Sequence, residues 1–202
     1  MPNDRFMLPL TGDSDIQRSF VSRAGQKLEA ALQTFPLLQV TGKIAADLGC
    51  NVGGFTDCLL QRGAAKVYAV DTAYGVLAWT LRKDPRVVVR ERSNALHVSL
   101  PEKVDILAID VGWTRQNKIL PYARTLLKLD AGDILTLIKP HYESEQAKKQ
   151  HGVLQESESI AVLEGVPDQI AALHFSIEGV IKSPIVGQKG NTEFVAWLKP
   201  LT

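Results

Sequence analysis

The chain has 202 residues, of which 45% are hydrophobic and 22% are charged, and its formal net charge is +1. This length is sufficient for one well-packed core, so we expect one domain, residues 21–202, after an N-terminal extension, residues 1–20. The near-zero charge excludes nucleic-acid binding through a positive field over the whole surface and leaves only a local basic patch. The sequence has no apolar run of about 18 residues, which excludes a membrane span.

Cysteine usage indicates a reducing compartment. The two cysteines, Cys50 and Cys58, lack the second pair or the histidine spacing that a zinc site needs. The N-terminus is charged and has no apolar segment of signal-peptide length. We therefore expect a cytoplasmic protein without a metal site.

Apolar runs and helical patterns alternate along the chain, which is typical of a parallel sheet covered by helices. Ser22 is placed to cap a first helix, whose apolar stripe includes Leu28, Leu32 and Phe35. The strands predicted after it are 44–47, 67–70, a short buried strand 87–89, 104–109, 134–138, 175–181 and 192–198. The predicted helices between them are 57–62, 76–83, 117–128 and a broken helix 160–173 around Pro167. Pro121 fits the helix 117–128 only if it lies in the first turn.

The turn Asp47-Leu48-Gly49-Cys50-Asn51-Val52-Gly53-Gly54-Phe55-Thr56 joins the first predicted strand to the next helix. An acidic residue at a strand end, a glycine-bearing turn and a helix form the cofactor side of open α/β sheets. Compared with the dinucleotide fingerprint, Asn51 replaces the middle glycine, which weighs against NAD and FAD. S-adenosylmethionine carries no phosphate and tolerates a side chain there, so it is the favoured cofactor.

Asp71 ends the predicted strand 67–70 and is the candidate partner of a cofactor ribose. An acidic residue about 20 positions beyond the glycine turn is expected in this role. The alternative is that the glycines only make a tight turn and that Asp71 caps a helix.

Four polar residues stand where an α/β sheet places functional groups, at a strand end or on an element bordering the same edge. They are Lys27, Asp110, Lys139 and Glu193. Each one taken alone is also compatible with a solvated terminus, so the prediction of a site depends on the whole set.

Several segments together resemble the FtsJ-type RNA ribose 2′-O-methyltransferases and, within them, the TlyA or haemolysin A branch. They are Ser22-Arg23-Ala24-Gly25-Gln26-Lys27-Leu28, Asp47-Leu48-Gly49, Gly53-Gly54-Phe55-Thr56-Asp57-Cys58-Leu59-Leu60, Tyr68-Ala69-Val70-Asp71, Ile109-Asp110-Val111, Lys139-Pro140 and Lys189-Gly190-Asn191-Thr192-Glu193-Phe194. The segments occur in the family's order and extend over roughly residues 20 to 198. The resemblance implies an α/β, Rossmann-like methyltransferase fold with a mostly parallel seven-stranded sheet and helices on both faces.

The resemblance also implies a Lys-Asp-Lys-Glu tetrad around a target ribose, formed here by Lys27, Asp110, Lys139 and Glu193. We expect Lys139 to accept the hydroxyl proton, Asp110 to orient Lys139, and the other two to hold the ribose. A lysine base needs a depressed pKa, which a sulfonium and Lys27 would favour and the two carboxylates would oppose. The alternative, in which Lys139 stays protonated and only steers the hydroxyl, remains open.

The cofactor residues that the resemblance implies surround either its amino acid end or its nucleoside. The first group is Asp47, Gly49, Asn51, Gly53, Gly54 and Phe55; Asp71 faces the ribose and Asn94 the adenine. Asn94 is equally compatible with an ordinary turn. Trp113 is a candidate for stacking on an RNA base, with half-buried packing as its alternative. Arg18, Arg23, Lys148, Lys149, Lys182 and Lys189 are candidate phosphate contacts, and His141 is interpreted as structural.

The chain departs from the branch in three places. Residues before Ser22 are too few for the N-terminal RNA-binding domain of the branch. The alternatives are a natural short form, a truncated chain, or a protein that depends on a separate RNA-recognition partner. Val111-Gly112-Trp113 replaces Val-Ser-Phe, and His141-Tyr142 replaces Gln-Phe. The predicted function is S-adenosylmethionine-dependent 2′-O-methylation of RNA, with ribosomal RNA as the expected substrate. The alternatives are a methyltransferase with a small-molecule acceptor, or a non-catalytic RNA-binding factor.

Overall fold

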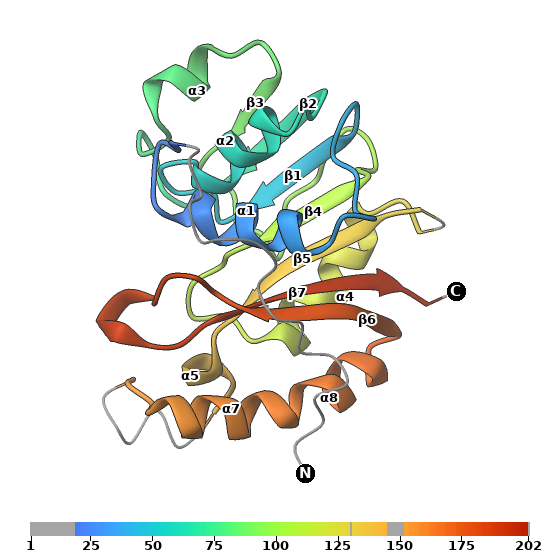
Figure 1. Cartoon of the computed structure of the whole chain (residues 1–202). Helices are drawn as coiled ribbons and strands as arrows, with labels where there is room; N and C mark the ends of the chain where they lie inside the picture. The colour runs from blue at the N-terminus through green and yellow to red at the C-terminus, as the bar shows by residue number, and fades with distance from the viewer. Residues whose placement is uncertain (1–18, 130, 145–151, 202) are drawn as a thin grey trace.

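The computed structural model describes residues 19–129, 131–144 and 152–201. Its centre is a seven-stranded sheet with the order β3-β2-β1-β4-β5-β7-β6 (Figure 1). The strands are β1 (Ile44–Leu48), β2 (Lys66–Val70), β3 (Val87–Arg90), β4 (Ile106–Ile109), β5 (Asp133–Ile138), β6 (Phe175–Lys182) and β7 (Phe194–Pro200). Strands β1 to β5 are parallel, and β7 is antiparallel to both β5 and β6. The predicted mostly parallel α/β fold is therefore confirmed.

Helices cover both faces of the sheet, as predicted. They are α1 (Ala24–Thr34), α2 (Gly54–Gln61), α3 (Trp79–Lys83), α4 (Gln116–Leu126), α5 (Pro140–Glu143), α7 (Glu156–Glu164) and α8 (Val166–Ala172), with a short 3-10 helix at Gln188–Gly190. One apolar core joins α1 and α2 to the sheet and includes Leu28, Leu59 and Ala45. The other joins α4 and α8 to the opposite face and includes Ile119, Ile170 and Ala46. Because Ala45 and Ala46 are neighbours in β1, their separation between the cores shows the alternation of a strand buried on both faces.

Three predicted elements differ from the structure because of tertiary contacts. The helix predicted at 76–83 begins only at Trp79, since Ala78 is extended and donates its backbone N–H to the carbonyl of Val52. The strand predicted as buried at 87–89 is only half-buried, because β3 is an edge strand with one neighbour. The predicted strand 104–109 is shortened to β4, and Val104 forms an isolated bridge with Leu127.

The expectation for Pro121 was wrong, because this proline lies inside α4 beyond the first turn. Its missing N–H leaves the carbonyl of Asn117 without the usual helical partner. Pro121 and Asn117 are both exposed, so water can satisfy that carbonyl. By contrast, the predicted break near Pro167 is confirmed: Gly165 separates α7 from α8, and Pro167 lies in the first turn of α8.

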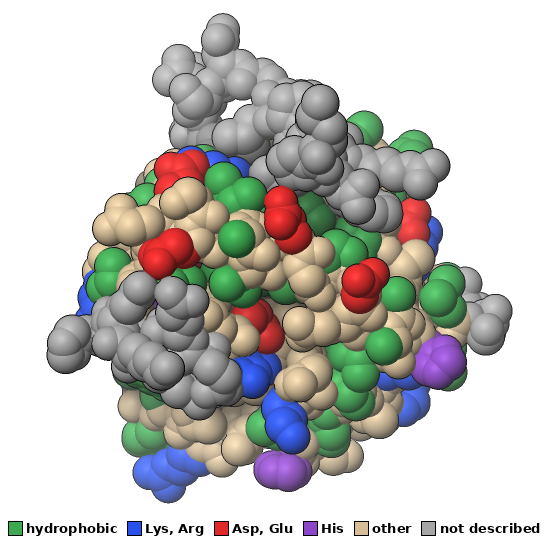
Figure 2. All heavy atoms as spheres, turned by 90° about the horizontal axis from the view of Figure 1, so that it is seen from below, with side chains coloured by type: hydrophobic (Ala, Val, Ile, Leu, Met, Phe, Trp, Pro, Cys, Tyr) green, Lys and Arg blue, Asp and Glu red, His purple; other side chains and the backbone are tan. Residues whose placement is uncertain are grey.

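The face of the molecule that includes α7 and α8 carries no concentrated basic patch among its described side chains. Figure 2 shows acidic, basic and hydrophobic groups interspersed there. No helix in the part of the chain that the structure describes is long and apolar enough to cross a membrane.

Candidate active site

The carboxyl ends of the parallel strands enclose the candidate site. Strands β2 and β3 lie on one side of β1, and the chain then crosses to β4 on the other side of β1. The strand order therefore reverses between β1 and β4. Open α/β sheets bind ligands at such a switch point. A cavity of about 600 Å³ lies here, and its wall is formed by α1, the turn after β1 and the segments that follow β2, β3, β4 and β5.

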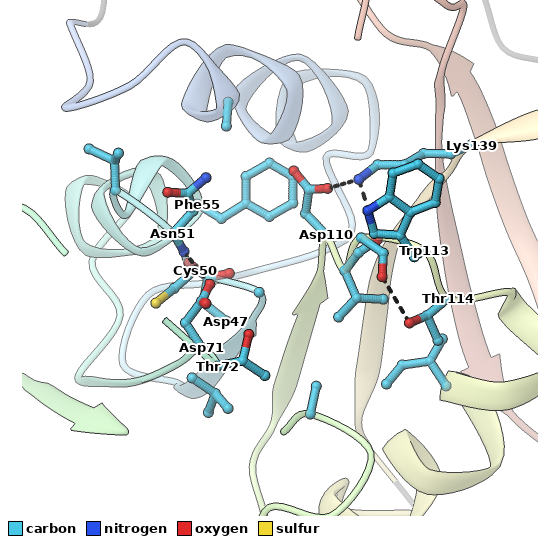
Figure 3. A pocket seen from close by; sticks show the side chains of 18 of the residues that line it. Asp47, Cys50, Asn51, Phe55, Asp71, Thr72, Asp110, Trp113, Thr114 and Lys139 are labelled. Atoms are coloured by element: carbon cyan, nitrogen blue, oxygen red, sulfur yellow. Dashed lines mark hydrogen bonds and ion pairs between the residues drawn. The ribbon is translucent and has the colours of Figure 1, made fainter. Parts of the chain in front are cut away.

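Most of the predicted site residues line this cavity. They are Lys27, Asp47, Gly49, Asn51, Phe55, Asp71, Asn94, Asp110, Lys139 and Glu193. Figure 3 shows Asp47, Asn51 and Asp71 grouped on one side, and Asp110 with Lys139 on the other. The structure thus brings the predicted cofactor residues and the predicted tetrad to one enclosed space.

Gly53 and Gly54 are outside the lining and shape the turn instead. Gly53 has φ +105° and immediately precedes α2, a backbone conformation that glycine adopts without strain. A Cβ atom on Gly54 would lie 2.3 Å from Ser22 Oγ and 2.7 Å from Gly25 N. Gly54 therefore allows α1 to pack closely against α2, which places Lys27 beside the cavity.

The tetrad consists of two ion pairs from four parts of the chain. Lys27 on α1 donates to the carboxylate of Glu193, which immediately precedes β7, and both side chains are buried. Lys139 Nζ, after β5, lies 2.6 Å from Asp110 Oδ1, after β4. Lys139 Nζ also donates to the carbonyl oxygen of Val111 at 3.3 Å. Pairing of this kind neutralises the charges and limits the directions in which each ammonium group can point.

The pKa of Lys139, whose direction the sequence left open, is raised in the protein without a ligand. Burial lowers the pKa of Lys139, but the charge and hydrogen bond of Asp110 and the charge of Glu193 outweigh it. The pKa is therefore raised above its ordinary value of 10.5, and Lys139 is an ammonium at neutral pH.

Asp47 has a free hydrogen-bonding position inside the site. Its Oδ2 accepts hydrogen bonds from the Thr56 backbone N–H at 2.8 Å and the Thr56 hydroxyl at 2.7 Å. Its Oδ1 is buried and has no partner among the described residues. Burial raises the pKa of Asp47 to about 7, and the charges of Asp110 and Asp71 add to this rise. A positively charged donor such as the ammonium of an amino acid would satisfy both the orphaned oxygen and the buried charge.

Asp71 and Asn94 lie at the nucleoside end that the sequence predicts. Asp71 does not cap a helix; its two carboxylate oxygens accept the backbone N–H groups of Asn51 and Ala73, each at 2.8 Å. Each oxygen keeps a lone pair that a ribose hydroxyl can use. Asn94 Oδ1 accepts the Leu96 N–H at 2.9 Å, so this residue forms a turn and also lines the cavity.

Two aromatic residues lie next to the tetrad, and only one of them was predicted. The side chain of Trp113 is 87% exposed, which rules out the half-buried packing considered for it. Its ring stacks on that of Tyr142, with centroids 5.2 Å apart and planes 29° apart. Tyr142 follows Lys139-Pro140-His141 in a single helical turn. The sequence singles it out only as a departure from the branch pattern, without indicating its contacts. His141 also lines the cavity; burial and the charges of Lys139 and Lys189 lower its pKa to about 4, so it is neutral.

The remaining candidates are dispersed. Of the predicted phosphate contacts, Arg23 lines the cavity and Lys182 pairs with Glu156, whereas Arg18, Lys148 and Lys149 lie outside the described residues. Cys50 and Cys58 are both buried, and neither forms a disulfide bond. Across residues 19–129, 131–144 and 152–201, no cluster of His, Cys, Asp and Glu could hold a metal ion.

Comparison with known proteins gives consistent matches. The family model described as FtsJ-like methyltransferase matches residues 20–200. The chain is 41% identical to YqxC of Bacillus subtilis (strain 168), named as an rRNA methyltransferase, over 95% of this chain and 69% of that protein. It is 38% identical to the 16S/23S rRNA (cytidine-2′-O)-methyltransferase TlyA of Mycobacterium tuberculosis (strain ATCC 25618 / H37Rv), over 96% and 73%. A solved structure from Streptococcus thermophilus, named as a hemolysin, superposes with a TM-score of 0.84 at 39% identity, over 91% and 68%.

Proposed function

The chain belongs to the FtsJ-like methyltransferase family, and from this premise we propose that it methylates the ribose 2′-hydroxyl group of ribosomal RNA. S-adenosylmethionine is the methyl donor of this family and fold. One observation carries the proposal: the ion pairs Lys27–Glu193 and Lys139–Asp110 line the same cavity as the glycine turn. Two lysines and two carboxylates suit a ribose hydroxyl flanked by phosphate better than an apolar acceptor.

The cofactor is held, in this proposal, by the residues that line one side of the cavity. Asp47 Oδ1 accepts the ammonium of the amino acid end, Gly49, Asn51 and Phe55 surround that end, and Asp71 binds the ribose hydroxyls. Asn94 lies near the adenine, while Gly53 and Gly54 act through the shape of the turn. When bound, the cofactor supplies a methyl group on a sulfonium, a cation that suits a site rich in carboxylates.

Lys139 activates the acceptor. It loses a proton to solvent, and the neutral amine then accepts the proton of the ribose hydroxyl. Loss of this proton would leave the ribose oxygen able to take the methyl group that the bound cofactor would supply. Asp110 holds Lys139 in position, and Lys27 with Glu193 holds the ribose, so that the hydroxyl is aligned behind the methyl group.

RNA is the macromolecular partner in this proposal. The names of the relatives support ribosomal RNA as the substrate. The exposed ring of Trp113, at the rim of the cavity, is suited to stack on an unstacked base. Because the net charge is only +1, we also propose that a separate partner contributes to RNA recognition. The methyltransferase unit is proposed to be residues 21–202, a boundary that the family match over residues 20–200 supports.

The test is transfer of a labelled methyl group from S-adenosylmethionine to total RNA and to ribosomal subunits from a host that lacks this protein. Nuclease digestion then identifies the labelled nucleoside. We expect a 2′-O-methylated nucleoside, with transfer abolished by Lys139→Ala and unchanged by Lys128→Ala. Lys128 is the matched control because it also forms an ion pair, with Asp105. Asp105 precedes β4, so this pair lies at the amino ends of the strands, away from the cavity.

Cofactor binding, measured by calorimetry, separates the two sides of the cavity. Lys139→Ala should leave the affinity within a few fold of the wild type, whereas Asp71→Ala should weaken it. Near-normal turnover of Lys139→Ala would contradict the role given to Lys139. Label on a small molecule, with none on RNA, would contradict the proposed substrate.

A further inference from the structure

Tyr142 makes three contacts that join the rim of the cavity to the tetrad. Its ring stacks on the exposed indole of Trp113, as described above. The same ring lies under the ammonium of Lys139, with Nζ 5.5 Å from the ring centroid. It also contacts the ring of His141, at 4.2 Å between centroids. Tyr142 is therefore the side chain that touches both Trp113 and Lys139.

The backbone that carries Tyr142 is firmly anchored. Helix α5 is a single turn, and Glu143 at its end accepts the backbone N–H of Gln116 at 2.8 Å. The carbonyl of Tyr142 accepts a hydrogen bond from Arg115 Nε at 3.1 Å. The buried side chain of Gln116 in turn bonds Thr136 Oγ1 and the carbonyl of Leu137 on β5. The strand that leads to Lys139 and the turn that carries Tyr142 are thus fixed to the same end of α4.

The head group of Lys139 is not fully fixed by its hydrogen bonds. Asp110 and the Val111 carbonyl engage two of the three N–H directions of an ammonium group. The ring of Tyr142 limits where the head group can move, and it attracts a cation through its electron-rich face. A displacement of this ring would therefore change the direction in which Lys139 points.

We propose that Tyr142 is a positioning residue that couples a base stacked on Trp113 to the head group of Lys139. This inference rests on the proposed function, because it takes the base to be that of the nucleotide to be methylated. A base on the free face of Trp113 presses the indole against Tyr142, and the Tyr142 ring holds Lys139 in the orientation that reaches the ribose hydroxyl. Tyr142 itself touches neither the hydroxyl nor the methyl group.

The kinetic test compares Tyr142→Phe, which keeps the ring, with Tyr142→Leu, which removes it. We expect Tyr142→Leu to lower kcat by about tenfold, since a misplaced activating group loses alignment, with the KM for S-adenosylmethionine unchanged. Tyr142→Phe should retain kcat within about twofold. In a double-mutant cycle, Trp113→Ala should reduce kcat less in the Tyr142→Leu background than in the wild type. Equal kcat for Tyr142→Leu and wild type, or equal losses for the Leu and Phe variants, would overturn the proposal.

A second readout does not depend on methyl transfer. In protein labelled with ¹³C at the lysine ε carbon, the Lys139 signal is identified by its absence from Lys139→Arg. We expect Tyr142→Leu to shift this signal because the ring current is lost, Trp113→Ala to shift it less, and Tyr142→Phe to leave it nearly unchanged. Thermal unfolding and cofactor affinity report whether each variant is folded. If the wild type transfers no methyl group but these shifts occur, the proposed function fails while the action of Tyr142 on the Lys139 head group is retained. A Lys139 signal that is insensitive to Tyr142→Leu would overturn the positioning role of Tyr142 itself.

Discussion

At the scale of single residues, the charge of Lys139 determines how the reaction depends on pH. Its pKa is raised because Asp110 and Glu193 outweigh burial, whereas the proposed reaction needs the neutral amine. Below its pKa, the neutral fraction of an amine increases tenfold for each pH unit. The single-turnover rate of methyl transfer should therefore rise by about tenfold per unit between pH 7 and pH 9.

The rate should be measured with saturating cofactor and RNA, so that changes in binding do not contribute. Unfolding curves at each pH show whether the fold is intact. A rate that is constant over this range would mean that Lys139 remains protonated and only steers the hydroxyl. That result would overturn the role of proton acceptor while keeping Lys139 in the site.

Asp47 makes the stability of the cofactor-free protein depend on pH. Its pKa is about 7 in the folded protein and 3.8 as an ordinary aspartate, so the folded state binds more protons between these values. The contribution of Asp47 to the free energy of unfolding is then highest below pH 3.8, and it is lost as the pH rises from 3.8 through 7. Asp47→Asn keeps an oxygen for the two Thr56 bonds and removes the buried charge.

We expect Asp47→Asn to gain stability over the wild type by on the order of 3 kcal/mol more at pH 8 than at pH 5. Urea unfolding at the two pH values measures this difference. The same variant should bind S-adenosylmethionine at least about tenfold more weakly, because a buried hydrogen-bonded charge pair is lost. An equal change in stability at both pH values would show that burial does not raise the pKa of Asp47.

Much of the candidate site could be predicted at this scale, but its internal contacts could not. Residue types and strand ends identify Lys27, Asp110, Lys139 and Glu193, and the cavity contains all four. The sequence indicates that Asp110 orients Lys139, but it does not say that Lys27 pairs with Glu193, or that the carboxylates outweigh burial in setting the pKa of Lys139. The importance of Tyr142 lies entirely in contacts with Trp113 and Lys139, which leave no pattern along the chain.

At the scale of elements, the close packing of α1 on α2 depends on Gly54. Its added Cβ would meet the backbone nitrogen of Gly25 at 2.7 Å, and backbone cannot move aside cheaply. Gly54→Ala should lower the free energy of unfolding by about 1–3 kcal/mol, as overpacking does. Because the displaced helix carries Lys27, kcat should also fall.

Gly165→Ala is the matched control for this prediction. Gly165 has φ −86°, and the nearest atom to an added Cβ is the Val162 carbonyl oxygen at 3.8 Å. This variant should match or slightly exceed the wild-type stability, since alanine restricts the unfolded chain. The urea midpoints of both variants test this prediction. Equal stability of Gly54→Ala and wild type would show that α1 and α2 can move apart without a loss of folding free energy.

The central elements could be predicted because their signals are local, and the errors occur where tertiary contacts decide. Apolar runs locate β1, β2 and β5 closely. The start of α3 is set by the Ala78–Val52 hydrogen bond, which the sequence does not reveal. The partial burial of β3 follows from its place at the edge, and strand order is not encoded in any one run.

At the scale of the whole molecule, the topology gathers residues that are far apart in the chain. Lys27 and Glu193 are 166 positions apart and yet form a buried pair. This is possible because β7 inserts beside β5, with its first residues at the edge where the parallel strands end. The antiparallel strand is therefore part of the site, and the sheet as a whole determines the geometry of the tetrad.

The net charge of the whole molecule limits how strongly it can attract RNA. With a net charge of +1, attraction must come from individual cations near the cavity, and Lys27 and Lys139 are already paired with carboxylates. Arg23 is exposed at the start of α1 and lines the cavity. Each phosphate contact contributes roughly −0.7 to −0.9 to the slope of log affinity against log salt concentration. We expect a shallow slope for isolated RNA, on the order of −2.

Arg23→Ala should weaken RNA binding uniformly across sequences and reduce the steepness of this slope by about one. Lys103→Ala is the control, because Lys103 is exposed just before β4, at the opposite edge of the sheet, and bonds the Thr125 carbonyl. Filter binding over a range of salt concentrations measures both variants. If Lys103→Ala changes the slope and Arg23→Ala does not, RNA enters from the other edge of the sheet. The proposed binding of the ribose at the tetrad would then be wrong.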